Sequence, residues 1–216
     1  MKSVIILSGG MDSTTLLYKL LNQWKEVKAI SFNYWQRHSI ELERAKATCD
    51  KLWVDHTIVD LQSITKLISN SSLTSDMEVP EWHYEDENMK KTVVPNRNSI
   101  MANIAIWYAV NIWAEEVALW VHSWDHAIYP DCRPEFIDAL DKLAQIANFQ
   151  PVRIYAPYIN SDKTWIIKDW IELWVDYSLT HTCYKWWEKA CGKCGSCQER
   201  LEAFEVNWIK DPITYE

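Results

Sequence analysis

The chain has 216 residues, enough for one large domain with a full core, or for one domain with an appendage. Its net charge of -8 at pH 7 argues against broad, non-specific binding to nucleic acid, which requires clustered Lys and Arg side chains. The charge therefore favours a small-molecule substrate. No apolar run approaches the roughly 20 residues of a membrane span and no signal-peptide pattern opens the chain, so we expect no membrane partner and a cytoplasmic location.

The first predicted element is a buried strand at Val4 to Leu7, followed by a glycine turn and then a helix. Gly9 and Gly10 can adopt positive φ, so that successive backbone N–H groups point at one anion, and the helix adds its positive N-terminal end. The Lys of a Walker loop is missing. The turn resembles the S-G-G-x-D-S loop of the ATP pyrophosphatases, which cleave ATP between the α and β phosphates. An ordinary turn after a strand is the alternative.

We call residues 8–14 the phosphate loop and expect it to bind ATP. Hydroxyl groups in this loop add donors for phosphate oxygens, and the Asp12 carboxylate can reach a metal ion such as Mg²⁺ or fix the loop. The predicted nucleotide-binding segment extends from the last strand residue into the helix. Its residues are Leu7, Ser8, Gly9, Gly10, Met11, Asp12, Ser13, Thr14, Thr15, Leu16 and Leu17.

The remaining periodicity predicts alternating strands and helices. Strands are expected at 27–32, 56–59, 117–121 and 152–155, and helices at 42–52, 63–68, 98–112, from Pro134 onward and at 162–173. This alternation indicates an α/β fold, an open parallel five-stranded sheet with right-handed crossovers and helices on both faces. Between Asn70 and Pro95 the periodicity fails, and six acidic residues from Asp76 to Glu87 predict a solvated lid or partner surface.

Ligands of open α/β sheets bind outside the carboxyl ends of the strands, so the informative loops are 8–14, 33–38, 95–98 and 122–133. Arg37 and His38 either contact nucleotide or substrate or lie in a solvated loop. Arg97, at a helix start, is a candidate clamp for phosphate or carboxylate through its planar fork. A surface ion pair is the other interpretation of Arg97.

Four of the six cysteines lie close together near the C-terminus. Cys183, Cys191, Cys194 and Cys197 follow C-x7-C-x2-C-x2-C spacing, and four thiolates at such spacing suit a structural, tetrahedral Zn²⁺ ion. An iron–sulfur cluster and free thiols are the alternatives. We therefore expect two units, a nucleotide-binding domain at 1–176 and a zinc-binding C-terminal segment, a zinc knuckle, at 177–216. Cys49 fits the core, and Cys132 fits either packing or a site.

Five segments together resemble the 7-cyano-7-deazaguanine synthases, and the resemblance extends from Ser8 to about Phe204. The segments are Ser8-Gly9-Gly10-Met11-Asp12-Ser13-Thr14-Thr15, Tyr34-Trp35-Gln36-Arg37-His38, Pro95-Asn96-Arg97-Asn98, Tyr129-Pro130-Asp131-Cys132-Arg133 and the four cysteines. The first loop alone also fits thiouridine-forming enzymes, lysidine synthetase, GMP synthetase and asparagine synthetase. The ordered set of segments carries the specificity.

The resemblance implies an adenine nucleotide alpha-hydrolase-like domain and a carbon–nitrogen ligase. It implies that the enzyme converts 7-carboxy-7-deazaguanine, ammonia and ATP to a nitrile through adenylated intermediates, in queuosine-type biosynthesis, with Zn²⁺ and Mg²⁺ and as a homodimer. A tRNA-modifying ATP pyrophosphatase of the thiolase or lysidine synthetase type is the alternative, and it predicts a basic face. A non-catalytic zinc-stabilised nucleotide-binding protein is a third.

The same resemblance suggests roles at the predicted site. Asp12 and Arg97 would act at the phosphates, Asp131 would accept hydrogen bonds from the guanine-type edge, and Arg133 would hold the reacting carboxylate. Asp131 and Arg133 also fit an ordinary helix start, because Pro134 opens a helix. Lys163 is a weaker candidate for the developing phosphate charge.

Tryptophan and glycine usage is abnormal: the chain has 14 Trp and 4 Gly, whereas average usage of roughly 7% predicts about 15 Gly. Trp53 and Trp174 end helical patterns, where a left-handed residue is wanted, and Trp24, Trp113 and Trp208 lie in similar connections. Trp35 and Trp120 occupy glycine positions of the resembling family. We infer that many of these positions are glycine in the natural protein, for example through a UGA codon that encodes glycine. A genuinely Trp-rich or engineered protein is the alternative.

Overall fold

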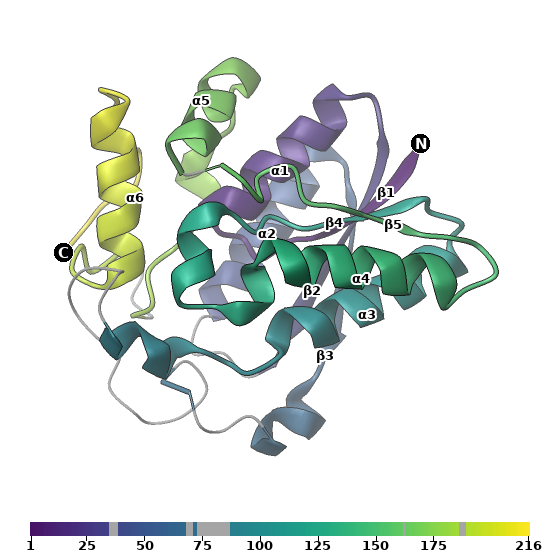
Figure 1. Ribbon diagram of the computed structural model, residues 1–216. Coiled ribbons are helices and arrows are strands. Elements are labelled where there is room, and N and C mark those ends of the chain that lie inside the picture. Colours follow the sequence, from purple (N-terminus) through teal and green to yellow (C-terminus); the bar gives the residue numbers. More distant parts are fainter. Residues whose placement is uncertain (35–38, 68–70, 73–86, 162, 186–188) are drawn as a thin grey trace.

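The structure is a computed structural model that describes residues 1–216 except 35–38, 68–70, 73–86, 162 and 186–188 (Figure 1). Its centre is a sheet of five parallel strands in the order β3-β2-β1-β4-β5. The strands are β1 (Lys2–Ile6), β2 (Glu26–Asn33), β3 (Asp55–Asp60), β4 (Glu116–Ala118) and β5 (Arg153–Tyr155). The predicted open parallel five-stranded sheet is confirmed.

The chain builds the sheet outward from β1 to β3 and then returns to the other side of β1 with β4. In the register, Ile5 of β1 stands between Ala29 of β2 and Ala118 of β4. The connections therefore diverge above β1 and β4, which is the switch point where ligands of such sheets bind. The phosphate loop follows β1 directly.

Six α-helices are described, and five of them cover the two faces of the sheet (Figure 1). They are α1 (Met11–Asn22), α2 (Ser39–Leu52), α3 (Arg97–Asn111), α4 (Pro134–Ile146), α5 (Lys163–Leu173) and α6 (Gly195–Val206). Short 3-10 helices lie at Gln62–Leu67, Glu87–Thr92, Ser123–Ala127, Pro130–Cys132 and Tyr177–Leu179. Within the described residues, no helix has both the length and the apolar character that crossing a membrane requires.

Alternation along β1 divides the core into two layers, because successive side chains of a strand point to opposite faces. Val4 and Ile6 pack with α3 and α4, for example against Ala105 and Ile137. On the other face, Ile5 packs with buried residues of α1, α2 and α5. Helices therefore cover both faces of the sheet, as the sequence predicts.

Helix α6 is the main element that the sequence did not predict. Its buried side chains include Glu199 and Arg200 beside Cys197 and Phe204, so the buried face is not an apolar stripe. Phe204 packs with Met11 of α1, and α6 contacts α5. The expected division of the chain at residues 176 and 177 stays a prediction.

The expected helix at 63–68 differs from the structure in its type, and most of the expected acidic lid cannot be compared with the structure. The predicted helix at 63–68 is the 3-10 helix Gln62–Leu67. Most of the expected acidic lid lies outside the described residues, and the structure resumes at the 3-10 helix Glu87–Thr92.

Five helix ends place a tryptophan in the left-handed region. The φ angles are 57° at Trp24, 56° at Trp53, 58° at Trp113, 55° at Trp174 and 57° at Trp208. At Trp24 the turn is a Schellman motif, in which the Trp24 N–H bonds to the Leu21 carbonyl at 2.9 Å and the Lys25 N–H bonds to the Leu20 carbonyl at 3.3 Å. All five indoles are exposed. These backbone positions are ones that glycine normally occupies.

Candidate active site

The phosphate loop is fixed by hydrogen bonds among its own residues. The Ser8 N–H donates to Ser13 Oγ at 3.2 Å, and the Gly10 N–H donates to Ser8 Oγ at 3.3 Å. The hydroxyl of Thr14 is buried, and no described group is hydrogen-bonded to it. The loop therefore presents its backbone at the start of α1, where N–H groups and the helix dipole favour an anion.

Gly9 lets another element approach this loop closely. Its φ is 85°, and a Cβ atom built there would overlap the carbonyl oxygen of Glu41. Gly10 differs, because its φ is -79° and its built Cβ would meet Ser8 Oγ at 3.3 Å and the His181 carbonyl oxygen at an ordinary contact distance of 3.7 Å. The first turn of α2 is thus held against the phosphate loop by the absence of a side chain at Gly9.

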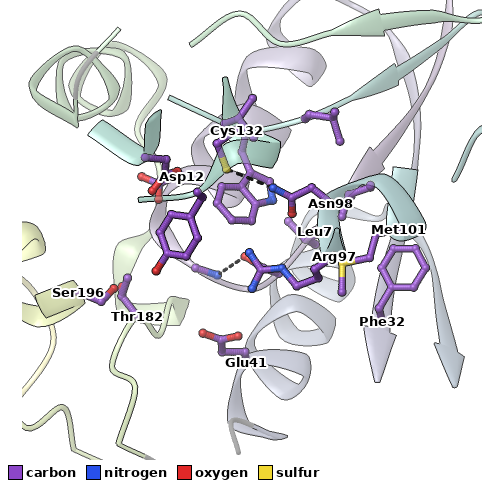
Figure 2. A pocket seen from close by; sticks show the side chains of 18 of the residues that line it. Leu7, Asp12, Phe32, Glu41, Arg97, Asn98, Met101, Cys132, Thr182 and Ser196 are labelled. Carbon is purple, nitrogen blue, oxygen red and sulfur yellow. Dashed lines mark hydrogen bonds between the residues drawn. The ribbon is translucent and has the colours of Figure 1, made fainter. Parts of the chain in front are cut away.

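A cavity lies beside the phosphate loop, at the carboxyl ends of β1, β2 and β4 (Figure 2). Its walls come from five parts of the chain that are distant in sequence. The lining residues are Ile6, Leu7, Ser8, Gly10, Asp12, Phe32, Tyr34, Glu41, Leu42, Arg97, Asn98, Met101, Leu119, Trp120, Val121, His122, Asp125, Tyr129, Cys132, Thr182, Tyr184, Ser196 and Glu199. The cavity combines an apolar floor with polar groups from several elements, which is typical of a small-molecule site.

The structure brings part of the predicted nucleotide-binding segment to this cavity. Leu7, Ser8, Gly10 and Asp12 line it. The remaining seven residues are not among its lining residues, although Gly9, Ser13 and Thr14 belong to the phosphate loop. Thr15 is hydrogen-bonded to Tyr177, and Met11, Leu16 and Leu17 lie in apolar clusters.

A histidine lies between two carboxylates on the cavity wall. His122 Nε2 is 3.8 Å from Asp12 Oδ2 and 3.5 Å from Asp125 Oδ2, and the His122 side chain is 1% exposed. Asp12 lies in the first turn of α1, and the other two residues follow β4. The loop 122–133 is a predicted site loop, but nothing in the spacing of His122 and Asp125 sets these two residues apart in the sequence.

Arg97 is half-buried and points into the cavity from the start of α3 (Figure 2). Burial lowers the pKa of its guanidinium, but the combined effect of nearby Tyr34, Cys132 and Asp131 is larger and raises it. The pKa of Arg97 therefore lies above its ordinary value. Arg97 therefore supplies a permanent positive charge. Its placement fits the predicted clamp for phosphate or carboxylate.

Asp131 and Arg133 lie next to the cavity but are not among its lining residues. The Asp131 Oδ2 atom accepts from the Asn98 N–H at 2.9 Å, which caps the first turn of α3. Arg133 is exposed and its Nε donates to the His126 carbonyl at 2.9 Å. The Asp131 contact is to the start of α3 and not to the helix that Pro134 opens, so it does not match the expected helix-start role. The substrate-binding roles of both residues stay predictions.

Five other residues that the sequence singles out differ in how far the structure describes them. Trp35, Arg37 and His38 lie outside the described residues. Lys163 is the first residue of α5, and only its backbone is described. Trp120 lines the cavity, so an indole does stand at the end of β4 as the sequence indicates.

Glu41 and Cys132 are two lining residues with shifted pKa values. Burial raises the pKa of Glu41 to about 8, although the nearby Arg97 charge acts to lower it. Burial also raises the pKa of Cys132, which keeps that thiol protonated and unsuited to act as a nucleophile. The sequence analysis left Cys132 open between packing and a site role, and it did not name Glu41.

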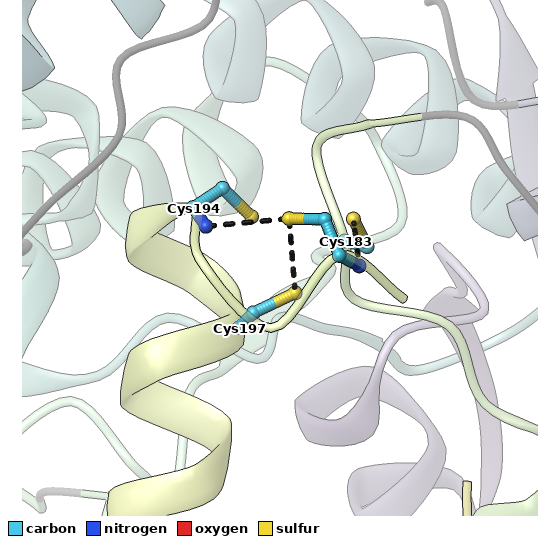
Figure 3. Close-up of side chains that lie close together, drawn as sticks. Cys183, Cys194 and Cys197 are labelled. Carbon is cyan, nitrogen blue, oxygen red and sulfur yellow. Dashed lines mark hydrogen bonds between the residues drawn. The ribbon is translucent and has the colours of Figure 1, made fainter. Parts of the chain in front are cut away.

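The four C-terminal cysteines form one buried cluster (Figure 3). Their Sγ atoms all lie within 4.8 Å of one another, and Cys191 Sγ is 4.0 Å from Cys197 Sγ. Hydrogen bonds from the Cys183 and Cys197 thiols lower the pKa of Cys194. In a tetrahedral site with metal–sulfur bonds of about 2.3 Å, sulfur atoms lie roughly 3.8 Å apart, so this cluster can hold a metal ion.

Solved structures of other proteins share the fold. An NH3-dependent NAD synthetase from Campylobacter jejuni aligns with a TM-score of 0.52 at 18% identity, covering 95% of this chain and 75% of that one. An NMN synthetase from Francisella tularensis aligns with a TM-score of 0.52 at 11% identity, covering 96% and 77%. At these identities the likeness concerns the fold alone.

Sequence comparison gives a closer relationship. A 7-cyano-7-deazaguanine synthase 1 from Colwellia psychrerythraea is 55% identical over 100% of this chain and 99% of that protein. A 7-cyano-7-deazaguanine synthase from Pseudoalteromonas translucida is 54% identical with the same coverage. The family model of the queuosine biosynthesis protein QueC matches residues 2–208. The chain therefore belongs to the QueC family of queuosine biosynthesis proteins.

Proposed function

We propose that this protein is an ATP-dependent 7-cyano-7-deazaguanine synthase, a carbon–nitrogen ligase of queuosine-type deazaguanine biosynthesis. The observation that carries the proposal is the shared cavity: the phosphate loop, the Arg97 guanidinium and the C-terminal residues Thr182 and Ser196 all border it. Family membership supplies the substrate class. The proposed location is the cytoplasm.

The proposed reaction activates a carboxylate twice. The carboxylate of 7-carboxy-7-deazaguanine attacks the α-phosphate of ATP, which gives an acyl-adenylate and releases pyrophosphate. Ammonia then displaces AMP and forms an amide. The amide oxygen then attacks the α-phosphate of a second ATP, which releases a second pyrophosphate, and loss of AMP and of both N–H protons leaves the nitrile. This chemistry needs positioning and charge stabilisation more than a nucleophilic side chain.

Protein groups take the following roles in this proposal. Backbone N–H groups of the phosphate loop and the start of α1 hold the leaving pyrophosphate. Arg97 neutralises charge on the phosphate or on the substrate carboxylate. Arg133 holds the reacting carboxylate of the substrate, the role that the family resemblance gave it.

Asp12 and Asp125 are the residues that would hold Mg²⁺. Their carboxylates approach one another around His122, and hard oxygen ligands of this kind suit that ion. Bound Mg²⁺ would stabilise the charge that develops on the phosphates.

Cys183, Cys191, Cys194 and Cys197 would hold a structural Zn²⁺ ion, because four thiolates leave no open position for a reacting ligand. The zinc proposal concerns the shape of the C-terminal segment and not the chemistry. We also propose that the protein forms a homodimer, because the family resemblance implies one.

The test is direct. Zinc-loaded, full-length protein is incubated with ATP, ammonia and 7-carboxy-7-deazaguanine, and the products are analysed by mass spectrometry. Two proteins are used in parallel, the chain as given and a variant with glycine at Trp35 and Trp120. We expect nitrile and AMP in at least one of them. Absence of AMP from both proteins contradicts the proposed function, and AMP formation that requires tRNA indicates the tRNA-modifying alternative.

A further inference from the structure

Glu41 is a carboxylate that lines the cavity beside the phosphate loop. It lies in the first turn of α2, where its backbone carbonyl packs against Gly9 of the phosphate loop. Its side chain and that of Arg97 point into the same cavity from α2 and α3 (Figure 2). Within the described ranges, no group donates a hydrogen bond to the Glu41 carboxylate.

The other carboxylates that line the cavity have different surroundings. Asp12 and Asp125 both lie within 4 Å of His122. Glu199 is 2% exposed and interacts with Tyr184. Glu41 is only half-buried, so its oxygen atoms retain access to a ligand in the cavity. Of the four carboxylates, Glu41 is the most exposed.

A guanine-type ring presents a specific partner for such a group. Its N1–H and 2-amino groups are adjacent donors that point in nearly the same direction, and one carboxylate can accept from both oxygens at once. Adenine has no such donor pair, because its N1 is an acceptor. A carboxylate in the cavity therefore distinguishes a guanine-type substrate from the adenine of ATP.

We propose that Glu41 accepts the N1–H and 2-amino hydrogen bonds of the deazaguanine substrate and so determines which base the cavity accepts. This inference rests on the proposed function. It gives Glu41 the role that the family resemblance suggested for Asp131, whose carboxylate caps α3. Burial raises the pKa of Glu41 to about 8 in spite of the Arg97 charge, so the two donors of the substrate have to stabilise the ionised carboxylate as they bind.

The experiment measures binding of two ligands by titration calorimetry. The ligands are 7-carboxy-7-deazaguanine and its analogue without the 2-amino group, and ATP with Mg²⁺ is titrated separately. The host is whichever of the two proteins tested above forms more AMP. The variants are Glu41→Gln, Asp131→Asn and Glu43→Gln, the last being a matched control because Glu43 is exposed on the same helix.

We expect Glu41→Gln to weaken binding of the deazaguanine about 10- to 100-fold, the range for hydrogen bonds to a charged group. ATP affinity should change less than about twofold. The host should prefer the ligand with the 2-amino group, and Glu41→Gln should abolish that preference. Glu43→Gln should leave both affinities and the preference unchanged. Thermal unfolding of each variant verifies that it is folded.

Several outcomes overturn the inference. Retained preference for the 2-amino ligand in Glu41→Gln excludes Glu41 as the residue that reads this edge, and loss of the preference in Asp131→Asn assigns the role to Asp131. An equal loss of ATP affinity in Glu41→Gln indicates a phosphate or magnesium role instead. If the host forms nitrile while Glu41→Gln binds normally, the inference fails and the proposed function stands. If the host binds no deazaguanine and forms no AMP, both fail.

Discussion

Gly9 and Gly10 are neighbours in the phosphate loop, yet they tolerate substitution differently. Gly9→Ala introduces a Cβ that overlaps the Glu41 carbonyl, at a left-handed φ of 85°. We expect it to lower the free energy of unfolding by about 2–3 kcal/mol and to weaken ATP binding, because α2 must move away from the loop.

Gly10→Ala is the matched control for this substitution. Its Cβ is close to the hydroxyl of Ser8, which can rotate, and at ordinary contact distance from the His181 carbonyl, so we expect a loss below about 1 kcal/mol. Urea unfolding and ATP titration of both variants make the comparison. Equal effects of the two substitutions would show that close packing at Gly9 is not what the loop requires.

The tryptophans at helix ends give a second test at single residues. We expect each substitution of Trp24, Trp53, Trp113, Trp174 or Trp208 by Gly to raise the free energy of unfolding by about 1 kcal/mol, because a left-handed backbone costs L-residues about that much. Urea unfolding of the five variants measures the change.

Trp107 provides the control because it is exposed in the interior of α3, where glycine is a poor helix former. Trp107→Gly should lower the free energy of unfolding by about 0.5 kcal/mol. The same sign for all six substitutions would contradict the backbone explanation.

The intact mass of the natively expressed protein tests the origin of the sequence, since a mass with 14 Trp excludes the recoded-glycine interpretation.

Among the secondary-structure elements, α6 depends on one buried ion pair. Arg200 is fully buried, and its Nε and Nη2 atoms donate to Asp211 at 2.6 and 2.9 Å. Its Nη1 atom donates to Thr180 at 2.8 Å and Thr182 at 3.0 Å. The neighbouring His181 N–H reaches the Gly9 carbonyl at 3.0 Å. The pair therefore holds α6, the cavity wall and the phosphate loop together.

We expect Asp211→Asn to lower the free energy of unfolding by about 3–5 kcal/mol, because it leaves the Arg200 charge buried without its partner. The exposed pair of Lys46 and Asp50, 3.6 Å apart, serves as a control, and Lys46→Gln should change stability by less than about 0.5 kcal/mol. Urea unfolding measures both. A small loss in Asp211→Asn would mean that the segment 177–182 is positioned by other contacts.

For the whole molecule, the cysteine cluster decides whether the C-terminal segment keeps its shape. We expect about one zinc and no iron per chain by elemental analysis. A strong chelator should lower the thermal unfolding temperature and weaken deazaguanine binding, because Thr182, Tyr184 and Ser196 line the cavity and adjoin the cysteines in sequence.

Two serine substitutions separate the metal site from the other thiols. Cys194→Ser should lose the metal, whereas Cys49→Ser, whose thiol is buried in the core under α2, should retain it. Iron in place of zinc would favour a cluster, and full stability after chelation would contradict a structural metal.

The sequence by itself determined the sheet, the phosphate loop and the cysteine cluster. Each of these is local in the chain: strands show apolar runs, Gly9 and Gly10 follow one directly, and four cysteines lie within 15 residues of one another. The sequence did not predict helix α6, because its buried face contains Glu199 and Arg200, whose partners come from elsewhere in the chain.

Only the tertiary structure decided which polar residues share the cavity. Glu41, Arg97 and His122 come from three separate loops or helix starts, and no spacing in the sequence relates them. Asp131 and Arg133 matched a motif, yet their side chains hydrogen-bond to backbone groups of Asn98 and His126. A parallel sheet gathers distant strand ends at one edge, so the composition of its site depends on the strand order, which the chain fixes only when it folds.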